Sequence, residues 1–114
     1  MAFDRPRPED QVIDLSVGLE ALFMNPREND IASHVSNRSA KYLEQSTQSF
    51  KELRGQVRQW YYVRSTIVHG DEPPCDLSAV VDGLTTVVRQ SLQKALGDPA
   101  SLGRVREYLR RSVN

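Results

Sequence analysis

The chain has 114 residues, of which 39% are hydrophobic, so it can form one modest core but not two. Its fifteen basic residues balance fifteen acidic ones, so binding to nucleic acid or to an anionic membrane requires a local basic patch. The single cysteine, Cys75, excludes an intrachain disulfide, and no apolar run approaches the ~18 residues of a membrane span, so we expect a cytoplasmic protein with no membrane partner.

Two helices are predicted in the first 45 residues. Residues 1–8 are expected to form an extended lead-in, because prolines lack the amide donor and disfavour helix in the residues before them. The first helix should run from about residue 9 to residue 24, and its apolar residues cover most of its circumference, which favours a central position. The second helix fits residues 30–45, with Asn29 or Asp30 as its N-cap.

The third predicted helix carries most of the residues of interest. It should begin after a cap at Ser46 or Thr47 and continue to about His69. Gly70 follows at the position where glycine commonly ends a helix, because glycine adopts the left-handed backbone conformation without a steric penalty.

Two more helices are predicted after a proline-containing loop. Asp76 should cap a helix that extends to Gly97, because its apolar residues repeat at helical spacing. A shorter helix should start at Asp98-Pro99 and reach about residue 112. No segment shows the alternating pattern of a strand. We therefore predict a single all-α domain over residues 1–114, an up-and-down bundle of about five helices over residues 9–112.

Three charged residues are predicted to lie on apolar helix faces. At 100° per residue, Arg64 falls within the apolar arc of the third helix, Glu20 within that of the first, and Arg38 within that of the second. A buried guanidinium without a partner would cost several kcal/mol, so each arginine requires a carboxylate or a ligand nearby. Two interpretations stay open: an ion network of Glu20 with Arg38 or Arg64 that fixes helix register, or an inward-facing site for an anionic substrate.

The opposite face of the third helix is predicted to carry a polar stripe of Lys51, Arg58, Tyr62, Ser65 and His69. Basic residues beside a tyrosine are suited to a nucleic-acid backbone and a stacked base, so Lys51, Arg58 and Tyr62 are candidate RNA-binding residues. A solvated helix face is an equally open interpretation of the same pattern.

His69 also has two interpretations. A histidine before a helix-ending glycine is commonly a capping residue that complements the helix dipole, and it is also a suitable general acid or base. Arg64 and His69 are five positions apart, roughly 140° around an ideal helix. Their side chains therefore converge only if the helix frays near Gly70 or if a second subunit brings its own pair.

Three blocks of the sequence resemble Apea-like HEPN domains. The segment Tyr61-Tyr62-Val63-Arg64-Ser65-Thr66-Ile67-Val68-His69-Gly70 is similar to the tyrosine-x-x-arginine-serine-x-x-valine-histidine-glycine signature of that family. Asp14-Leu15-Ser16-Val17-Gly18-Leu19-Glu20-Ala21-Leu22-Phe23 resembles the first helix of the family, and Arg38-Ser39-Ala40-Lys41-Tyr42-Leu43 resembles the second. The blocks occur in the same order and spacing, and the resemblance covers residues 10 to 96.

The resemblance implies an RNA-cleaving helical fold of the HEPN type in which Arg64 and His69 of two subunits meet across a twofold interface. His69 would act as general acid or base, and Arg64 would bind the scissile phosphate. No metal or other cofactor would be needed, because the 2′-hydroxyl is the nucleophile. Glu20, Arg38, Ser65 and Tyr61 would support the pair. Ser65 departs from many active HEPN nucleases, which carry asparagine, aspartate or histidine there, although serine is usual in the Apea-like branch.

The leading functional hypothesis is a metal-independent endoribonuclease domain of the prokaryotic antiviral defence or toxin type. Its expected partners are RNA, a second copy of the chain, and an antitoxin or an additional N-terminal sensor domain. The alternative is a non-catalytic HEPN module that dimerises or docks a partner, and a third interpretation is a purely structural bundle. Other chemistries have little support, because the two histidines show no metal-ligand spacing and the chain has no glycine-rich phosphate loop.

Overall fold

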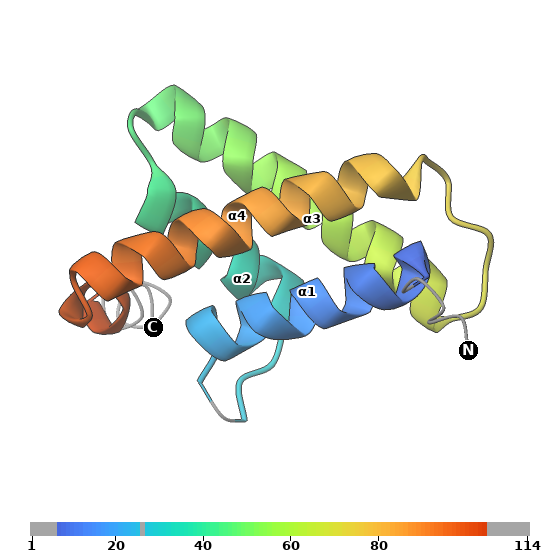
Figure 1. Cartoon of the computed structure of the whole chain (residues 1–114), viewed down its shortest axis with the longest axis horizontal. Helices are drawn as coiled ribbons and strands as arrows, with labels where there is room; N and C mark the ends of the chain where they lie inside the picture. Colours follow the sequence, from blue (N-terminus) through green and yellow to red (C-terminus); the bar gives the residue numbers. More distant parts are fainter. Residues whose placement is uncertain (1–6, 26, 105–114) are drawn as a thin grey trace, which may run out of the picture.

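The computed structural model describes residues 7–25 and 27–104, and this part of the chain is helical without strands (Figure 1). The helices are α1 (Pro8–Phe23), α2 (Ile31–Leu43), α3 (Thr47–Val68) and α4 (Leu77–Gly97). A further helical stretch occupies residues 100–104, where the fifth helix was predicted to start. The all-α prediction is confirmed. The remainder of the fifth helix and most of the extended lead-in lie outside the described residues.

The helix boundaries follow local capping signals. Pro8 occupies the first turn of α1, where its missing amide is not needed. Ser46 caps α3 through a capping box, in which its side chain accepts from the Ser49 amide at 3.0 Å while the Ser49 hydroxyl accepts from the Ser46 amide at 2.9 Å. Asp76 caps α4 by accepting from the Ser78 amide at 2.9 Å, as predicted.

The C-terminal end of α3 is a Schellman turn. His69 is the C-cap residue, and Gly70 follows with a φ of 78°. The Gly70 amide donates to the Ile67 carbonyl and the Asp71 amide donates to the Thr66 carbonyl, both at 3.0 Å. The predicted role of Gly70 is confirmed, and the helix closes here instead of fraying.

α2 starts after the predicted N-cap residue but without a capping hydrogen bond. Asp30 is its N-cap residue, but Asp30 adopts the left-handed conformation (φ 58°) and its side chain makes no capping hydrogen bond. Arg27 in the same loop also has a positive φ, of 69°. Two non-glycine residues in this conformation indicate that packing at the base of the loop, and not a local capping preference, sets its path.

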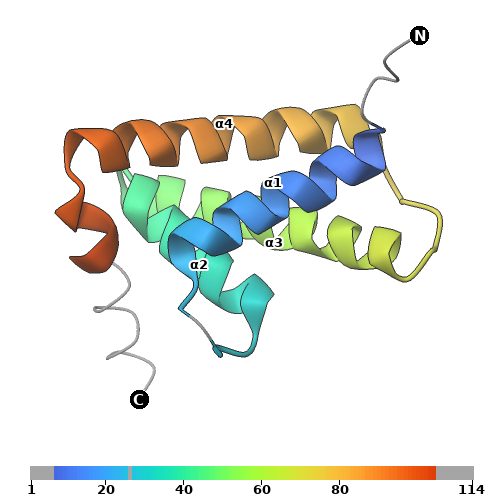
Figure 2. The ribbon, with the colours of Figure 1, turned by 60° about the horizontal axis from the view of Figure 1, so that its bottom comes forward.

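The four helices form a bundle in which α1 contacts each of the others. α3 and α4 run antiparallel around the loop that joins them, whereas α1 and α4 run in the same direction and α2 crosses obliquely (Figures 1 and 2). The up-and-down order therefore describes the α3–α4 pair. Every pair of the four helices is in contact, so α1 is not more central than the others. The buried core takes residues from all four helices: Val12, Leu19, Phe23, Val35, Tyr42, Val57, Tyr61, Val63, Val80, Leu84 and Val87.

One glycine permits the close approach of α3 and α4. A Cβ atom added at Gly83 would lie 2.3 Å from Cζ2 of Trp60, so only glycine fits against the indole ring. Trp60 is partly buried and packs on the core. Gly18 and Gly55 have no such packing role, because an added Cβ at either position meets nothing within 4 Å. Among the described residues, no helix combines the length and the apolar character needed to cross a membrane.

Candidate active site where α1 meets α3

The Arg64 guanidinium lies between α3 and α1, next to Glu20. Nη2 of Arg64 is 3.9 Å from Oε2 of Glu20, and the guanidinium carbon lies 5.7 Å from the centre of the Tyr61 ring. The buried Tyr61 hydroxyl is 3.2 Å from the Ser16 carbonyl oxygen and 3.3 Å from Oε2 of Glu20. Tyr61 thus ties the two helices together and orients the carboxylate that faces Arg64.

The Arg64 guanidinium keeps a hydrogen-bond donor that none of the described residues accepts from. The 3.9 Å contact with Glu20 is an ion pair but too long for a hydrogen bond. The Nε atoms of Arg64 and Arg38 are both buried and have no hydrogen-bond partner within residues 7–25 and 27–104. About a quarter of the side chain is exposed (27%), so an anion can reach it from solvent. A guanidinium in this state is suited to a phosphate, which accepts two parallel hydrogen bonds from it.

Tyr61 acts as a hydrogen-bond donor and not as an acid or base at neutral pH. Burial, and then the charge of Glu20, raise the pKa of the phenol well above its ordinary value of 10. The hydroxyl therefore keeps its proton. Its supporting role, implied by the resemblance, corresponds here to holding Glu20 in place.

His69 lies at the end of α3 with its imidazole exposed. Nδ1 is 3.0 Å from the carbonyl oxygen of Ser65, one helical turn earlier. A carbonyl only accepts hydrogen bonds, so Nδ1 carries the proton in this arrangement and Nε2 of a neutral imidazole has a free lone pair. The geometry presents Nε2 as a general base or, after protonation, as a general acid.

Within one chain, Arg64 and His69 are not brought together. The described contacts of Arg64 are with Glu20 and Tyr61, whereas His69 contacts the backbone of its own helix. The closed turn at Gly70 removes fraying as a route to convergence. Of the two conditions set out from the sequence, fraying is therefore excluded, and a second subunit stays a prediction.

Arg38 belongs to a different pair. It is fully buried and donates to both carboxylate oxygens of Glu28 at 2.6 Å and to the Phe23 carbonyl at 2.7 Å. Of the two partners left open for Glu20, the structure therefore shows Arg64 and not Arg38. Sequence reasoning missed Glu28. The sequence signal for this pair was an acidic residue in the loop between the first two helices, ten residues before an arginine predicted to face inward.

The Arg38 pair fastens the loop between α1 and α2. Glu28 also accepts the Asn25 amide at 2.6 Å, and Nε2 of His34 lies 3.9 Å from its carboxylate. The hydrogen bonds from Arg38 are the main cause that lowers the pKa of Glu28 from 4.5 to about 2. The described contacts of Arg38 reach no residue of the Arg64 site, so the support that Arg38 gives is to the end of α1.

The predicted polar stripe is exposed along the outer face of α3. Lys51, Arg58, Tyr62, Ser65 and His69 are all solvent-accessible, with Tyr62 61% exposed. Lys51 lies about 27 Å from His69 along the helix, at 1.5 Å per residue, so it is remote from the imidazole. The Ser65 side chain points to solvent, and its backbone carbonyl is the part that contacts His69.

A hollow of about 370 Å³ lies beyond the end of α3. Its lining contains Ile67, Gly70 and Pro73, together with one cation and four carboxylates: Arg7, Glu9, Asp10, Asp71 and Glu72. Arg7 is 3.5 Å from Glu9, which leaves the hollow acidic. A phosphate is repelled here, so the hollow next to His69 is not the anion site. Within residues 7–25 and 27–104, no group of three or more His, Cys, Asp and Glu side chains is placed to hold a metal ion.

Comparisons with known proteins add no family to this geometry. No family model matches the sequence, and neither a curated protein nor a solved structure matches it. The resemblance to HEPN domains therefore depends on the three sequence blocks of this chain alone.

Proposed function

We propose that the chain is a metal-independent endoribonuclease domain that works as a homodimer, with Arg64 and His69 of two copies in one site. The observation that carries the proposal is the state of Arg64. Its Nε has no partner among the described residues, its contact with Glu20 is 3.9 Å long, and its side chain is partly exposed, unlike that of Arg38. A phosphate of the RNA backbone would fill the unused donors. His69, with its Nε2 free, supplies the proton transfer on the same helix.

The proposed reaction uses the 2′-hydroxyl of the RNA as its nucleophile. Nε2 of one His69 takes the hydroxyl proton while the 2′-oxygen attacks the adjacent phosphorus. The bond from phosphorus to the 5′-oxygen breaks, and that oxygen receives a proton from the imidazolium of the other copy. Arg64 stabilises the negative charge that develops on the phosphoryl oxygens. The products are a 2′,3′-cyclic phosphate and a 5′-hydroxyl.

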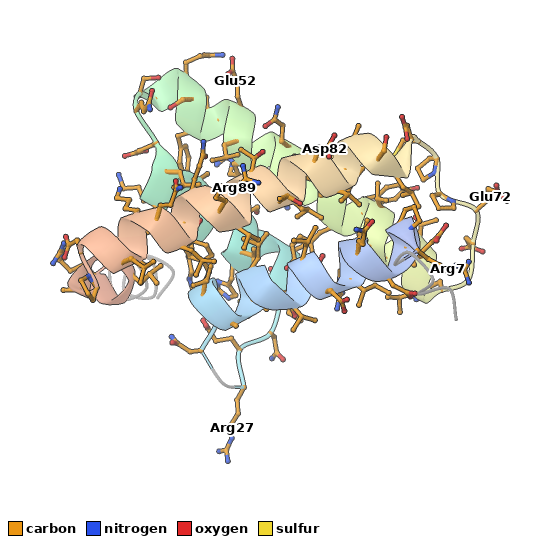
Figure 3. All side chains as sticks on the ribbon, in the orientation of Figure 1. Arg7, Arg27, Glu52, Glu72, Asp82 and Arg89 are labelled. Carbon is orange, nitrogen blue, oxygen red and sulfur yellow. The ribbon has the colours of Figure 1, made fainter. Side chains whose placement is uncertain are left out.

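The test is cleavage of a labelled single-stranded RNA by the purified chain in excess chelator. We expect cleavage by the parent chain and losses of about 10²–10⁴ in rate for Arg64→Ala and His69→Ala, the range for a removed general acid or base. Arg89→Ala is the matched control, because Arg89 is an exposed cation on α4 (Figure 3). An RNA methylated at every 2′-oxygen should resist cleavage. Strict metal dependence would reject the mechanism.

The second candidate is a non-catalytic module that dimerises or docks an antitoxin. It is favoured by the two large apolar side chains exposed on α3, Tyr62 and Val68, at 61% and 58%. Under this alternative His69→Ala alters assembly or stability and not RNA cleavage. Expression of the intact chain in a prokaryotic host distinguishes the two. If the parent chain arrests growth and His69→Ala does not, the result supports the nuclease and its toxin or defence role.

A further inference from the structure

Arg64 and Glu20 form an ion pair of a different kind from Arg38 and Glu28. Arg38 donates to both carboxylate oxygens of Glu28 at 2.6 Å, so that carboxylate is committed to its arginine. Nη2 of Arg64, in contrast, stays 3.9 Å from Oε2 of Glu20, which is too long for a hydrogen bond. The guanidinium of Arg64 can therefore bind a ligand while Glu20 stays beside it.

Glu20 is held at this distance by Tyr61. The Tyr61 hydroxyl lies 3.3 Å from Oε2 of Glu20 and 3.2 Å from the Ser16 carbonyl oxygen, so its one proton is shared between two acceptors on α1. The side chains of Arg64 and Glu20 are exposed to similar extents, 27% and 21%. An anion that reaches Arg64 from solvent therefore also meets the Glu20 carboxylate.

The charges of Arg64 and Glu20 cancel each other. Within residues 7–25 and 27–104, neither side chain has a second ion-pair partner. A second copy, as in the proposed function, adds one more Arg64 and one more Glu20, so the balance stays the same. Arg64 therefore attracts an anion only at short range, and the carboxylate reduces that attraction.

A neutral pair of this kind distinguishes between two classes of phosphate. A phosphodiester carries one negative charge, whereas a phosphate monoester carries about 1.5 to 2 at pH 7. The cost of removing an ion from water rises with the square of its charge, but its attraction to Arg64 rises only in proportion to the charge. Glu20 then repels the monoester about twice as strongly as the diester. The balance favours the singly charged ester.

We propose that Glu20 is a specificity-determining residue, which restricts the Arg64 site to singly charged phosphodiesters and rejects phosphate monoesters. This inference rests on the proposed function and deepens it by naming the substrate class. An internal linkage of the RNA is accepted, because each of its phosphates carries one charge. A terminal phosphate or a free mononucleotide is rejected, so the 3′- or 5′-phosphorylated ends of other RNAs do not compete with the substrate.

The size of the effect follows from the geometry. An anion oxygen that accepts from Arg64 lies about 2.8 Å beyond the 3.9 Å contact, so it is roughly 6.7 Å from the Glu20 carboxylate. At that distance in a water-like dielectric, removing one charge strengthens the binding of a monoanion about threefold and of a dianion about tenfold. A purely structural role for Glu20 predicts the opposite, because a loosened Arg64 would bind both anions more weakly.

The test is a titration of the ¹⁵N-labelled full chain with dimethyl phosphate and with methyl phosphate, followed by NMR at about pH 7.5, where the monoester is mostly a dianion. The Arg64 Nε–H resonance is assigned by its loss in Arg64→Lys. We expect the parent to bind dimethyl phosphate at least about threefold more tightly than methyl phosphate. In Glu20→Gln both anions should bind more tightly and this preference should disappear, whereas Glu20→Asp keeps the charge and should keep the preference.

Glu9→Gln is the matched control. It removes one carboxylate from the same helix, where Glu9 pairs with Arg7 at 3.5 Å, but it lies about 16 Å from Glu20 along α1 at 1.5 Å per residue. Charges in solvent are screened over about 8 Å, so this variant should bind both anions as the parent does when ionic strength is held constant. The Nε–H resonance of the fully buried Arg38 should not move in any titration.

Four results overturn the proposal. The first is a parent chain that binds methyl phosphate as tightly as dimethyl phosphate, and the second is an Arg64 resonance that neither anion moves. The third is weaker binding of both anions by Glu20→Gln, which assigns Glu20 a structural role only. The fourth is an equal change of preference in Glu9→Gln, which assigns the effect to net charge and not to this pair.

RNA cleavage in excess chelator, measured with the same samples, separates this proposal from the proposed function. A preference for the diester that Glu20→Gln abolishes, in a chain that does not cleave RNA, supports the role of Glu20 and rejects the nuclease. Metal-independent cleavage by a parent chain that shows no such preference supports the nuclease and rejects the role of Glu20.

Discussion

Arg38 shows what one fully buried guanidinium accomplishes in this chain. Three of its hydrogen bonds close the loop between α1 and α2, two to the Glu28 carboxylate and one to the Phe23 carbonyl at the end of α1. Glu28 also accepts from the Asn25 amide. Charge-assisted hydrogen bonds of this bidentate kind are the strong ones in proteins. The same loop contains Arg27 and Asp30 at positive φ, a conformation that aspartate adopts more readily than arginine.

Replacing Glu28 by glutamine should therefore be costly. Glu28→Gln leaves the buried Arg38 without a counter-charge, and we expect a loss of about 3 kcal/mol in the free energy of unfolding, as for other broken buried pairs. Glu44→Gln is the control, because Glu44 pairs with Lys41 at 2.8 Å on the surface and should change stability by less than about 1 kcal/mol. Urea denaturation measures both. Equal effects of the two changes would show that burial of Arg38 is not the cause.

The same carboxylate gives stability a predictable pH dependence. The pKa of Glu28 is about 2 in the folded chain against 4.5 ordinarily, so the unfolded chain binds the proton more readily. The stabilisation is fully present above about pH 4.5 and is lost as the pH falls toward 2. We expect the stability difference between the parent and Glu28→Gln to shrink over that interval. A difference that stays constant from pH 5 to about pH 2 would contradict the assignment.

At the scale of the helices, the ends were predictable and the contacts between helices were not. Ser46, Asp76 and Gly70 were identified as helix ends because capping depends on residues within one turn. Arg64 was identified as inward-facing from helical spacing alone. Its pairing with Glu20 was one of two open choices, and Glu28 was missed, because such pairs depend on how helices and loops meet in space. The function itself stays a prediction.

Alanine substitutions at Gly83 and Gly55 test how tightly α3 and α4 pack. Gly83→Ala places a methyl group against the Trp60 ring, and we expect a net loss of about 1–2 kcal/mol in stability as the ring or α4 shifts. Gly55→Ala meets nothing within 4 Å and should stabilise the chain by about 0.5–1 kcal/mol through helix propensity. Thermal denaturation of the two variants should give shifts in opposite directions. A stabilised Gly83→Ala variant would mean that Trp60 moves aside freely.

For the whole molecule, the central fact is that one copy does not bring Arg64 and His69 together. Two copies are needed if the proposed function holds, so catalysis depends on concentration. We expect the rate per chain to be constant at high concentration and to fall in proportion to concentration below the dimer dissociation constant. Serial dilution in the RNA-cleavage assay, beside sedimentation, measures this. A rate per chain that survives dilution into monomers would place a complete site within one copy.

The Schellman turn has a consequence for the transfer of this imidazole to another scaffold. The ring direction of His69 is set by the Ser65 carbonyl, and that carbonyl stays aligned because the next residues coil back through Gly70. A histidine grafted alone onto another helix would keep its acid–base chemistry but would lose the ring orientation that the Ser65 carbonyl sets here. The unit to transfer is therefore the last turn of the helix together with the glycine that ends it. Replacing Gly70 by alanine should leave His69 at the end of the helix but change the direction of its imidazole.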